Sequence, residues 1–419
     1  MNFGLAVRWR IAILLCLITT VNYIDRQAFA VAGPVIAEEF ALSNTEFGFI
    51  VSAFLFAYAI GQLIVGPVID RLGTKRAFSL AVVAWSLAGM LCAAGRGFWS
   101  FLTYRSLLGA AEAANFPAAL KSIAEWFPDA DRSLAVGIVT IGPGLGAIIS
   151  PPLLGFLIVT LGWPWAFILP GAAGFVWLWI WQIYYHAPEQ HPTLSPTERG
   201  LIMRDREPFE AGADNRRWFD VVRFFRYREV WGLMLSRFVN DGAFYFYVSW
   251  LPLYLAQERG FDIRQIAMFA WIPFLAADLG SLSGGWLGRR FIQNGMSLDR
   301  SRKILIWGGA VLVLLTLPAA TVDSPYTALG LIGVAMFAIQ GKAANLFALP
   351  ADLFPPREVG TIWGLFGAVG SFGGMVFNVA VGWVTDEFSY APVFLAVGIT
   401  QILSALFVTW LIPRICRIT

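Results

Sequence analysis

Long blocks of apolar residues, rather than an alternating pattern, dominate the chain. The block from Val21 to Val31, for instance, is interrupted only by Asn22 and by the adjacent Asp25, Arg26 and Gln27. About 20 apolar residues cross a bilayer as a helix, because a helix satisfies its own backbone hydrogen bonds where water is absent. Blocks separated by Gly, Pro and charged residues predict twelve membrane-spanning helices. The predicted spans are 9–32, 46–68, 77–95, 98–122, 133–160, 164–186, 229–256, 265–288, 303–321, 325–352, 359–383 and 391–413.

One long polar stretch, residues 187–228, separates the sixth span from the seventh. The chain is therefore predicted to be an all-α polytopic membrane protein with two six-helix bundles, over residues 1–186 and 229–419. The stretch between them is rich in Arg and Pro. It is expected to form short amphipathic pieces, or a plain tether, between the bundles.

The Lys and Arg residues are distributed unevenly between the two sides of the predicted membrane. Of the 30, 22 fall on the side that holds both termini and the linker, three on the other side, and five within spans. Positive charge marks the cytoplasmic side, so both termini and the linker are predicted to be cytoplasmic. The net charge of +3 reflects this asymmetry and does not indicate a nucleic-acid partner.

Composition excludes a soluble enzyme. Charged residues make up 14% of the chain and hydrophobic residues 58%, whereas a soluble chain carries about 25% charged residues. No phosphate-binding loop or nucleophile–base set appears. Three Cys and two His lack the spacing of a metal site, so no metal or cofactor is expected. The N-terminal apolar run is interpreted as a retained first helix and not as a signal peptide.

The loop between the second and third spans carries a motif, G-x-x-x-D-R-x-G-x-K/R-K/R. Gly66 would let two helices approach closely, Asp70 would bond a neighbouring helix end or arginine, and Gly73 would permit a tight turn. The motif residues are Gly66, Asp70, Arg71, Gly73, Lys75 and Arg76. This is the loop signature of the major facilitator superfamily, which the chain resembles. The second half contains a partial copy of this motif near Gly288, in which the acidic residue is absent.

Further segments make the resemblance specific to one family within this superfamily. They include Tyr23-Ile-Asp25-Arg26, the run from Arg105 to Pro117, and Glu125-Trp-Phe-Pro128. Together they resemble the anion:cation symporter family of bacterial sugar-acid transporters. The likeness is greatest to the hexuronate (galacturonate and glucuronate) transporters, followed by the D-galactonate (aldonate) group. It implies a bacterial inner-membrane protein.

Four charged residues fall well inside spans of the first half, away from the span ends: Asp25, Arg26, Arg105 and Glu112. A lone charge at the bilayer centre costs about 2.5–3.5 kcal/mol, so a persistent one is usually paired or functional. Arg105 and Glu112 are seven residues apart and thus project from one helix face. One acid beside one arginine would suffice for a structural salt bridge. The second acid favours proton coupling, because a carboxyl beside an arginine can exchange a proton for an anion. Purely structural salt bridges remain the alternative.

The resemblance assigns roles to these residues and to two tyrosines. It implies proton coupling at Asp25 and Glu112, and substrate binding at Tyr23, Arg26, Tyr58 and Arg105, with Arg26 holding the substrate carboxylate. Two departures leave the sugar acid open. Asp25 matches the aldonate group and not the hexuronate transporters, and Pro143 stands where the aldonate group carries a glutamine.

The second half offers fewer candidates. Arg237 and Asp241 are four residues apart, a spacing that favours mutual pairing, while Asp278 has no partner visible in the sequence. The substrate-binding candidates of the tenth span are Gln340, Lys342, Asn345 and Phe347. Lys342 is expected either to face the central cavity or to pair with Asp278 or Asp241.

The sequence therefore predicts a proton-driven symporter that imports a sugar-acid anion, foremost a hexuronate, by alternating access. Its expected partners are a small organic anion, protons and the bilayer, and it is expected to act as a monomer. The rival hypotheses are a symporter for another organic anion (an aldonate, an aldarate or an aromatic carboxylate), a proton-antiport exporter, and a substrate-sensing receptor.

Overall fold

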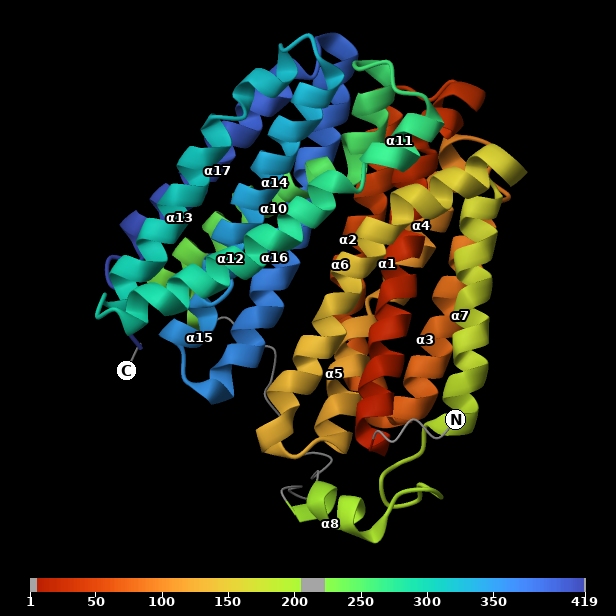
Figure 1. Cartoon of the computed structure of the whole chain (residues 1–419), viewed down its shortest axis with the longest axis vertical. Helices are drawn as coiled ribbons and strands as arrows, with labels where there is room; N and C mark the ends of the chain where they lie inside the picture. The colour runs from red at the N-terminus through yellow and green to blue at the C-terminus, as the bar shows by residue number, and fades with distance from the viewer. Residues whose placement is uncertain (1–5, 205–222, 418–419) are drawn as a thin grey trace.

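The computed structural model describes residues 6–204 and 223–417, and within these ranges every regular element is a helix (Figure 1). Residues 205–222 of the predicted linker lie outside them. The first half contains α1 (Val7–Glu39), α2 (Asn44–Leu72), α3 (Thr74–Cys92), α4 (Phe98–Glu112), α5 (Asn115–Trp126), α6 (Asp129–Leu161) and α7 (Trp165–Tyr184). The linker contains α8 (Pro196–Arg204) and η1 (Arg223–Arg226). The second half contains α10 (Arg228–Gln257), α11 (Ile263–Phe269), α12 (Ile272–Gln293), α13 (Leu298–Leu314), η2 (Leu317–Ala320), α14 (Pro325–Leu346), α15 (Leu349–Leu353), α16 (Pro356–Glu387) and α17 (Ala391–Leu411).

Each of the twelve predicted spans corresponds to one helix or to two consecutive pieces of helix, which confirms the all-helical fold class. Ten spans in the described ranges are long and apolar enough to cross a membrane. The other two are 98–122, which is divided into α4 and α5, and 229–256, the region of α10. Helix α10 carries Arg237 and Asp241 among its apolar residues, so its charges account for its lower hydropathy.

Prolines divide four of the predicted spans. Helix α11 ends at Phe269, four residues before Pro273, and α13 and α14 end at the same distance from Pro318 and Pro350. The break after α4 lies beside Ala113, four residues before Pro117. A proline ring clashes with the carbonyl four residues earlier and cannot donate a hydrogen bond to it. Each break therefore lies where a proline removes a backbone hydrogen bond, although other prolines, such as Pro143 and Pro252, lie inside continuous helices.

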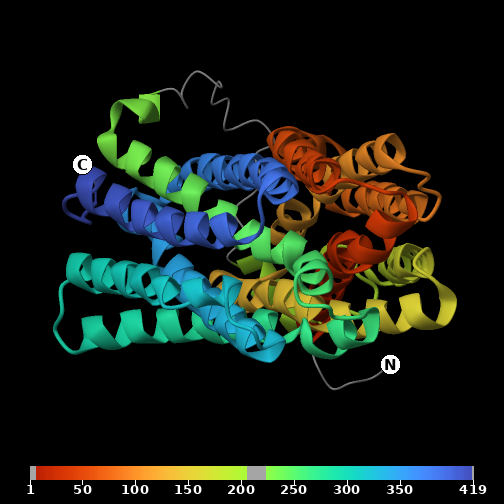
Figure 2. The ribbon, with the colours of Figure 1, turned by 90° about the horizontal axis from the view of Figure 1, so that it is seen from above.

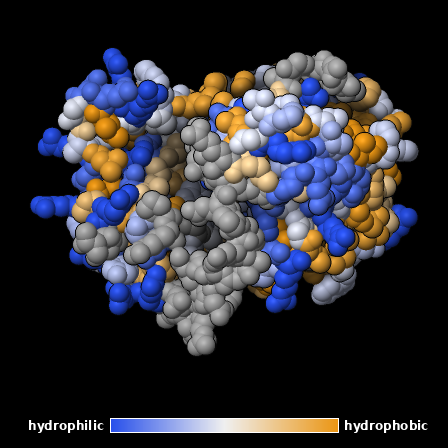
Figure 3. Space-filling model, turned by 90° about the horizontal axis from the view of Figure 1, so that it is seen from below, coloured by the Kyte–Doolittle hydropathy of each residue, from blue (hydrophilic) through white to orange (hydrophobic). Residues whose placement is uncertain are grey.

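The two halves pack side by side as helical bundles (Figures 1 and 2). Helices α1, α2 and α6 of the first half contact α10, α16 and α11 of the second half. The bundles meet at the end of the molecule away from α8 and diverge toward α8 (Figure 1). The face on the α8 side carries many hydrophilic residues over both bundles, among smaller hydrophobic patches (Figure 3). The bundles are therefore in contact at the end away from α8, here called the closed end, and their helices lie farther apart toward the linker (Figure 1).

The loop motif forms a tight turn between α2 and α3. Gly73 has a φ of 75°, a left-handed conformation that glycine adopts without strain. Asp70 pairs with Lys121 of α5 at 2.6 Å, so its partner is a lysine of the same bundle. The expectation that Gly66 allows a close approach of helices is not met, because nothing lies within 4 Å of where its Cβ would be. This stretch of α2 is largely exposed, as Ile64 and Val68 show.

A carboxylate joins the bundles at the closed end. Asp386 of α16 accepts hydrogen bonds from the backbone N–H groups of Asn44, at 2.9 Å, and Thr45, at 2.7 Å. Both groups belong to the first turn of α2, where the helix dipole favours negative charge. Gln257 of α10 donates to the Asn44 side chain at 3.1 Å. Asp386 therefore caps a helix of the opposite bundle.

Replacing Asp386 by alanine removes two charge-assisted bonds that exist only when this end is closed. A lost helix cap costs about 1 kcal/mol, so we expect the ratio of closed to open molecules to fall several-fold. Electron–electron distance measurements between spin labels on α2 and α16 would report this ratio. Glu387→Ala, at the neighbouring exposed acid, is the control. Equal distance distributions in the two variants would contradict the assignment.

Candidate functional site

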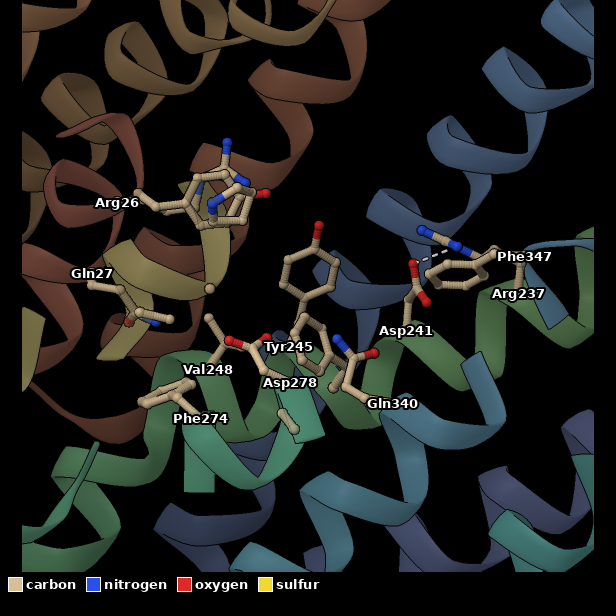
Figure 4. A pocket seen from close by; sticks show the side chains of 16 residues that line it. Arg26, Gln27, Arg237, Asp241, Tyr245, Val248, Phe274, Asp278, Gln340 and Phe347 are labelled. Atoms are coloured by element: carbon tan, nitrogen blue, oxygen red, sulfur yellow. Dashed lines mark ion pairs between the residues drawn. The ribbon is translucent and has the colours of Figure 1, made fainter. Parts of the chain in front are cut away.

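A cavity of about 250 Å³ lies between the bundles (Figure 4). At ~30 Å³ per water molecule it has room for about eight waters, the scale of a small solute. Helices α1 and α6 form one wall, and α10, α12 and the end of α14 form the other. The cavity is lined by Tyr23, Arg26, Gln27, Pro143, Gly144, Ala147, Arg237, Asp241, Phe244, Tyr245, Val248, Phe274, Ala277, Asp278, Gln340 and Phe347.

Arg26 is the cation of the first-half wall. Its Nη2 and Nε donate to one oxygen of Glu112, at 3.0 and 3.1 Å. The guanidinium also lies against three aromatic rings, with centroids at 4.6 Å for Tyr23, 4.7 Å for Tyr58 and 5.0 Å for Phe54. The rings hold the cation by cation–π attraction and shield it from water. Arg26 is thus held between a buried acid and the cavity.

Behind Arg26, a second acid and a second arginine lie out of contact with the cavity. Arg105 is buried, places its guanidinium 4.5 Å from the Phe54 ring centroid, and donates to the backbone carbonyl of Arg26 at 3.5 Å. Asp25 is buried against Gly89 of α3, and neither carboxylate oxygen has a hydrogen-bond partner among the described residues. The second oxygen of Glu112 also lacks one. This group of four charges, Asp25, Arg26, Arg105 and Glu112, is the N-half charge cluster.

The second-half wall contains an ion pair. Arg237 Nε lies 2.6 Å from Asp241, which confirms the predicted pairing. Asn240 donates to Asp241 at 3.1 Å, and the Arg237 guanidinium lies 3.7 Å from the centroid of Phe347. In Figure 4 the pair and Phe347 face the cavity opposite Arg26, with Tyr245 between them.

The candidates of the tenth span divide by helix face. Gln340 and Phe347, seven residues apart, line the cavity. The prediction that Lys342 faces the cavity is wrong in this structure, and so is its rival, because no ion pair joins it to Asp278 or Asp241 among the described residues. Its amine instead donates to Gln401 of α17, at 2.8 Å to the side chain and 3.2 Å to the backbone carbonyl. At 100° per residue, position 342 points away from 340 and 347.

Asn345 also lies on the far face of α14. Its amide donates to the carbonyls of Gly284, at 3.0 Å, and Gly341, at 3.2 Å, and its oxygen accepts from Arg302 at 3.0 Å. Two of these bonds tie α14 to α12 and α13, and the third lies within α14. The prediction that Asn345 lines the substrate site does not match this position. The side chain is fully buried away from the cavity.

Several cavity residues were not predicted. Gln27 follows Arg26 directly, Tyr245 is one helical turn beyond Asp241, and Phe274 lies one turn before Asp278. The turn spacing was a usable signal, since residues four apart share a helix face. Tyr58 and Arg105, which were predicted to bind substrate, lie behind the wall and contact Arg26 or its surrounding rings instead.

Comparison with known proteins places the chain in a family. The model of the Major Facilitator Superfamily matches residues 15–341 and 292–415. The chain belongs to this superfamily. Two solved structures share the fold. A bacterial homolog of the human lysosomal transporter Spinster, inward-facing and unoccupied, has a TM-score of 0.76 at 18% identity and covers 97% of this chain and 95% of its own. The inward-open xylose transporter XylE from E. coli has a TM-score of 0.71 at 16% identity and covers 97% and 96%.

Several proteins of similar sequence are named as transporters of sugar acids. The hexuronate transporter of Escherichia coli (strain K12) is 35% identical over 96% of this chain and 93% of its own length. The galacturonate transporter of Dickeya chrysanthemi is 34% identical, covering 77% and 94%, and the D-galactonate transporter of Escherichia coli O6:H1 is 29% identical, covering 98% and 97%. These relatives agree with the resemblance stated from the motifs. The chain is therefore a multi-span membrane transporter and not an enzyme.

Alanine substitutions at Asn345 and Gln340 test which face of α14 each residue occupies. Asn345→Ala removes three hydrogen bonds of a fully buried side chain. Each partner left unsatisfied costs about 1–3 kcal/mol, so we expect a clear fall in the melting temperature of the detergent-purified protein. Gln340→Ala opens only onto the cavity and should leave the melting temperature nearly unchanged. A larger loss of stability in Gln340→Ala than in Asn345→Ala would contradict the assignment of the faces.

Proposed function

We propose that the chain is a proton symporter that imports a sugar-acid monoanion, with hexuronates as the substrate class, into the bacterial cytoplasm. The names of the relatives support the substrate class. The N-half charge cluster supports the coupling. In this proposal the linker side is cytoplasmic, as the distribution of Lys and Arg predicts, so the structure corresponds to an inward-open carrier that acts as a monomer in the inner membrane.

The observation that carries the proposal is the imbalance of partners inside the cluster. Glu112 is paired with Arg26 through one oxygen, whereas Asp25 is buried with no hydrogen-bond partner among the described residues. An uncompensated charge in the interior costs several kcal/mol, which protonation removes. Asp25 and Glu112 therefore have the environment of groups that gain and lose protons during the cycle.

The pair between Arg26 and Glu112 links the proton to the substrate. While Glu112 is ionised, it is the counter-ion of Arg26. Once Glu112 is protonated, Arg26 is free to take a carboxylate from the cavity, and charge-assisted bonds of this kind are the strong ones. Arg105 lies close enough to stabilise the ionised acids electrostatically, and it orients Arg26 through the backbone carbonyl. Binding of the proton and binding of the anion are thus coupled.

The remaining cavity residues suit a sugar. Gln27 and Gln340 present amides that both donate and accept hydrogen bonds, as hydroxyl groups require. Tyr23, Tyr245 and Phe347 supply flat apolar faces on both walls, against which the C–H face of a sugar can pack. Tyr58 supports the site indirectly, through its contact with Arg26.

Transport follows from rocking of the bundles about this midplane site. In the outward-open form the acids are protonated and the anion binds. The neutralised site is then free to close and reopen toward the linker side, where the anion and protons leave and Glu112 recaptures Arg26. Each charge that moves inward contributes about 2.3 kcal/mol per 100 mV. Two protons with one monoanion would therefore draw on the membrane potential.

Neutralising either acid should uncouple transport. In proteoliposomes, Asp25→Asn and Glu112→Gln are expected to lose accumulation of labelled galacturonate driven by a pH gradient. Exchange of labelled for unlabelled substrate requires no proton cycle and should persist. Asp323→Asn, an exposed acid outside the spans, is the control. Normal accumulation by both acid variants would disprove the coupling scheme, and outward pumping would favour a proton-antiport exporter.

Arg26→Lys keeps the positive charge but removes the planar group that lies among three rings and donates twice to Glu112. Because lysine is a compact point charge, the two residues are not interchangeable at such a site. We expect galacturonate to bind at least about tenfold more weakly, which is about 1.4 kcal/mol, as measured by calorimetry. Arg96→Lys, at an exposed arginine, is the matched control. Unaltered affinity in Arg26→Lys would exclude Arg26 as the carboxylate ligand.

A further inference from the structure

The charged residues of the N-half charge cluster and of the cavity lining do not balance one another. The cations are Arg26, Arg105 and Arg237, and the acids are Asp25, Glu112, Asp241 and Asp278. Two acids have an arginine partner, Glu112 at 3.0 Å and Asp241 at 2.6 Å. Asp25 is buried out of contact with the cavity, where the proposed cycle protonates it. Asp278 remains, and the proposed cycle gives it no task.

Asp278 is a free carboxylate in the cavity itself. It lies on α12, is only half-buried, and has no hydrogen bond or ion pair to any described residue. It lies against Gly144 of α6, where a methyl group would overlap the carboxylate. The charge therefore sits at the contact between the two bundles, beside Gln340 and across from Arg26 (Figure 4).

We propose that Asp278 is a specificity-determining residue that selects sugar acids with one carboxylate and rejects those with two. The inference rests on the proposed function, because it assumes a site loaded with two protons. With Asp25 and Glu112 protonated, three arginines face two ionised acids, which leaves one positive charge. One substrate carboxylate balances this charge. A second carboxylate would leave an unpaired negative charge in a poorly solvated site, where charge interactions are strong.

Hydrogen bonding, like charge, favours substrates with one carboxylate over those with two. A sugar acid whose carboxylate binds Arg26 directs its other end toward the second-half wall, where Asp278 and Gln340 lie. A terminal hydroxyl can donate a hydrogen bond to the Asp278 carboxylate. A second substrate carboxylate accepts hydrogen bonds only, as Asp278 does, so the two groups repel. Lys342 lies on the far face of α14, where its amine donates to Gln401, so it is not a hydrogen-bond partner for a carboxylate in the cavity.

Galactonate and galactarate provide a matched pair of probes. They share the same chain of hydroxyls and differ at one end, which is a hydroxymethyl group in galactonate and a carboxylate in galactarate. Calorimetry on the purified full chain at one mildly acidic pH would give the affinity ratio of the two acids. The wild type should prefer galactonate. Asp278→Asn should shift the ratio toward galactarate by about tenfold, equivalent to about 1.4 kcal/mol.

Three further variants complete the test. Asp278→Glu keeps the charge and should keep the preference, Asp278→Ser should reproduce the shift if the Asn variant folds poorly, and Asp323→Asn controls for surface charge. A wild type that prefers galactarate, or a ratio unchanged in both neutral variants, would overturn the proposal. The ratio is a binding measurement. Loss of the coupling scheme would appear separately, as uptake without pH dependence, even where the ratio behaves as expected.

Discussion

A charge among membrane-spanning helices must find an opposite charge, a proton or a bound ion, because lipid and packed side chains do not solvate it. The arrangement of this transporter depends on that constraint. Glu112 meets it with Arg26, and Asp241 meets it with Arg237. Asp25 has no hydrogen-bond partner among the described residues. In the proposed cycle the partners of these charges change. When Glu112 takes a proton, Arg26 exchanges Glu112 for the substrate carboxylate as its counter-ion.

Proline breaks place this chemistry at helix ends. Glu112 is the last residue of α4, just before the break imposed by Pro117, and Phe347 directly follows α14, whose end is set by Pro350. Unpaired backbone is tolerated at membrane depth where it is enclosed by protein or borders a cavity. The breaks thus adjoin the N-half charge cluster in one bundle and the cavity wall in the other. The same local rule of chain geometry serves both bundles.

The two ends of the molecule are built differently. At the closed end, Asp386 caps α2 across the interface, and the Phe47 and Trp250 rings pack edge to face with centroids 5.0 Å apart. At the linker end, the motif acid Asp70 pairs with Lys121 of its own bundle. The closed end thus combines exposed hydrogen bonds with buried ring packing, and alternating access requires that these contacts form and separate in each cycle. The cavity lies between these ends, where both bundles contribute charge.

Much of the site could be read from the sequence, and the errors have a clear cause. Charged residues within apolar spans identified Asp25, Arg26, Arg105 and Glu112, because such residues persist only with partners or a role. The four candidates of the tenth span were chosen by polarity or resemblance alone. Helical spacing would have placed Gln340 and Phe347 on one face of the helix and Lys342 and Asn345 on the other. It would not have shown which of the two faces lines the cavity. That depends on how α14 is rotated within its bundle, and the rotation is set by neighbours distant in sequence, such as Gln401 and Arg302.

The number of spans and the charged residues held inside the membrane could be predicted from the sequence alone. Apolar length and charge act locally, so both can be read along the chain. The packing of the helices shows that Glu112, and not Asp25, pairs with Arg26, and that Asp386 caps α2. It also shows that Asp278 faces the cavity with no hydrogen-bond or ion-pair partner in the described part of the chain. These features depend on which helix faces meet across the bundles. That choice belongs to the packing of the whole chain and to no single segment.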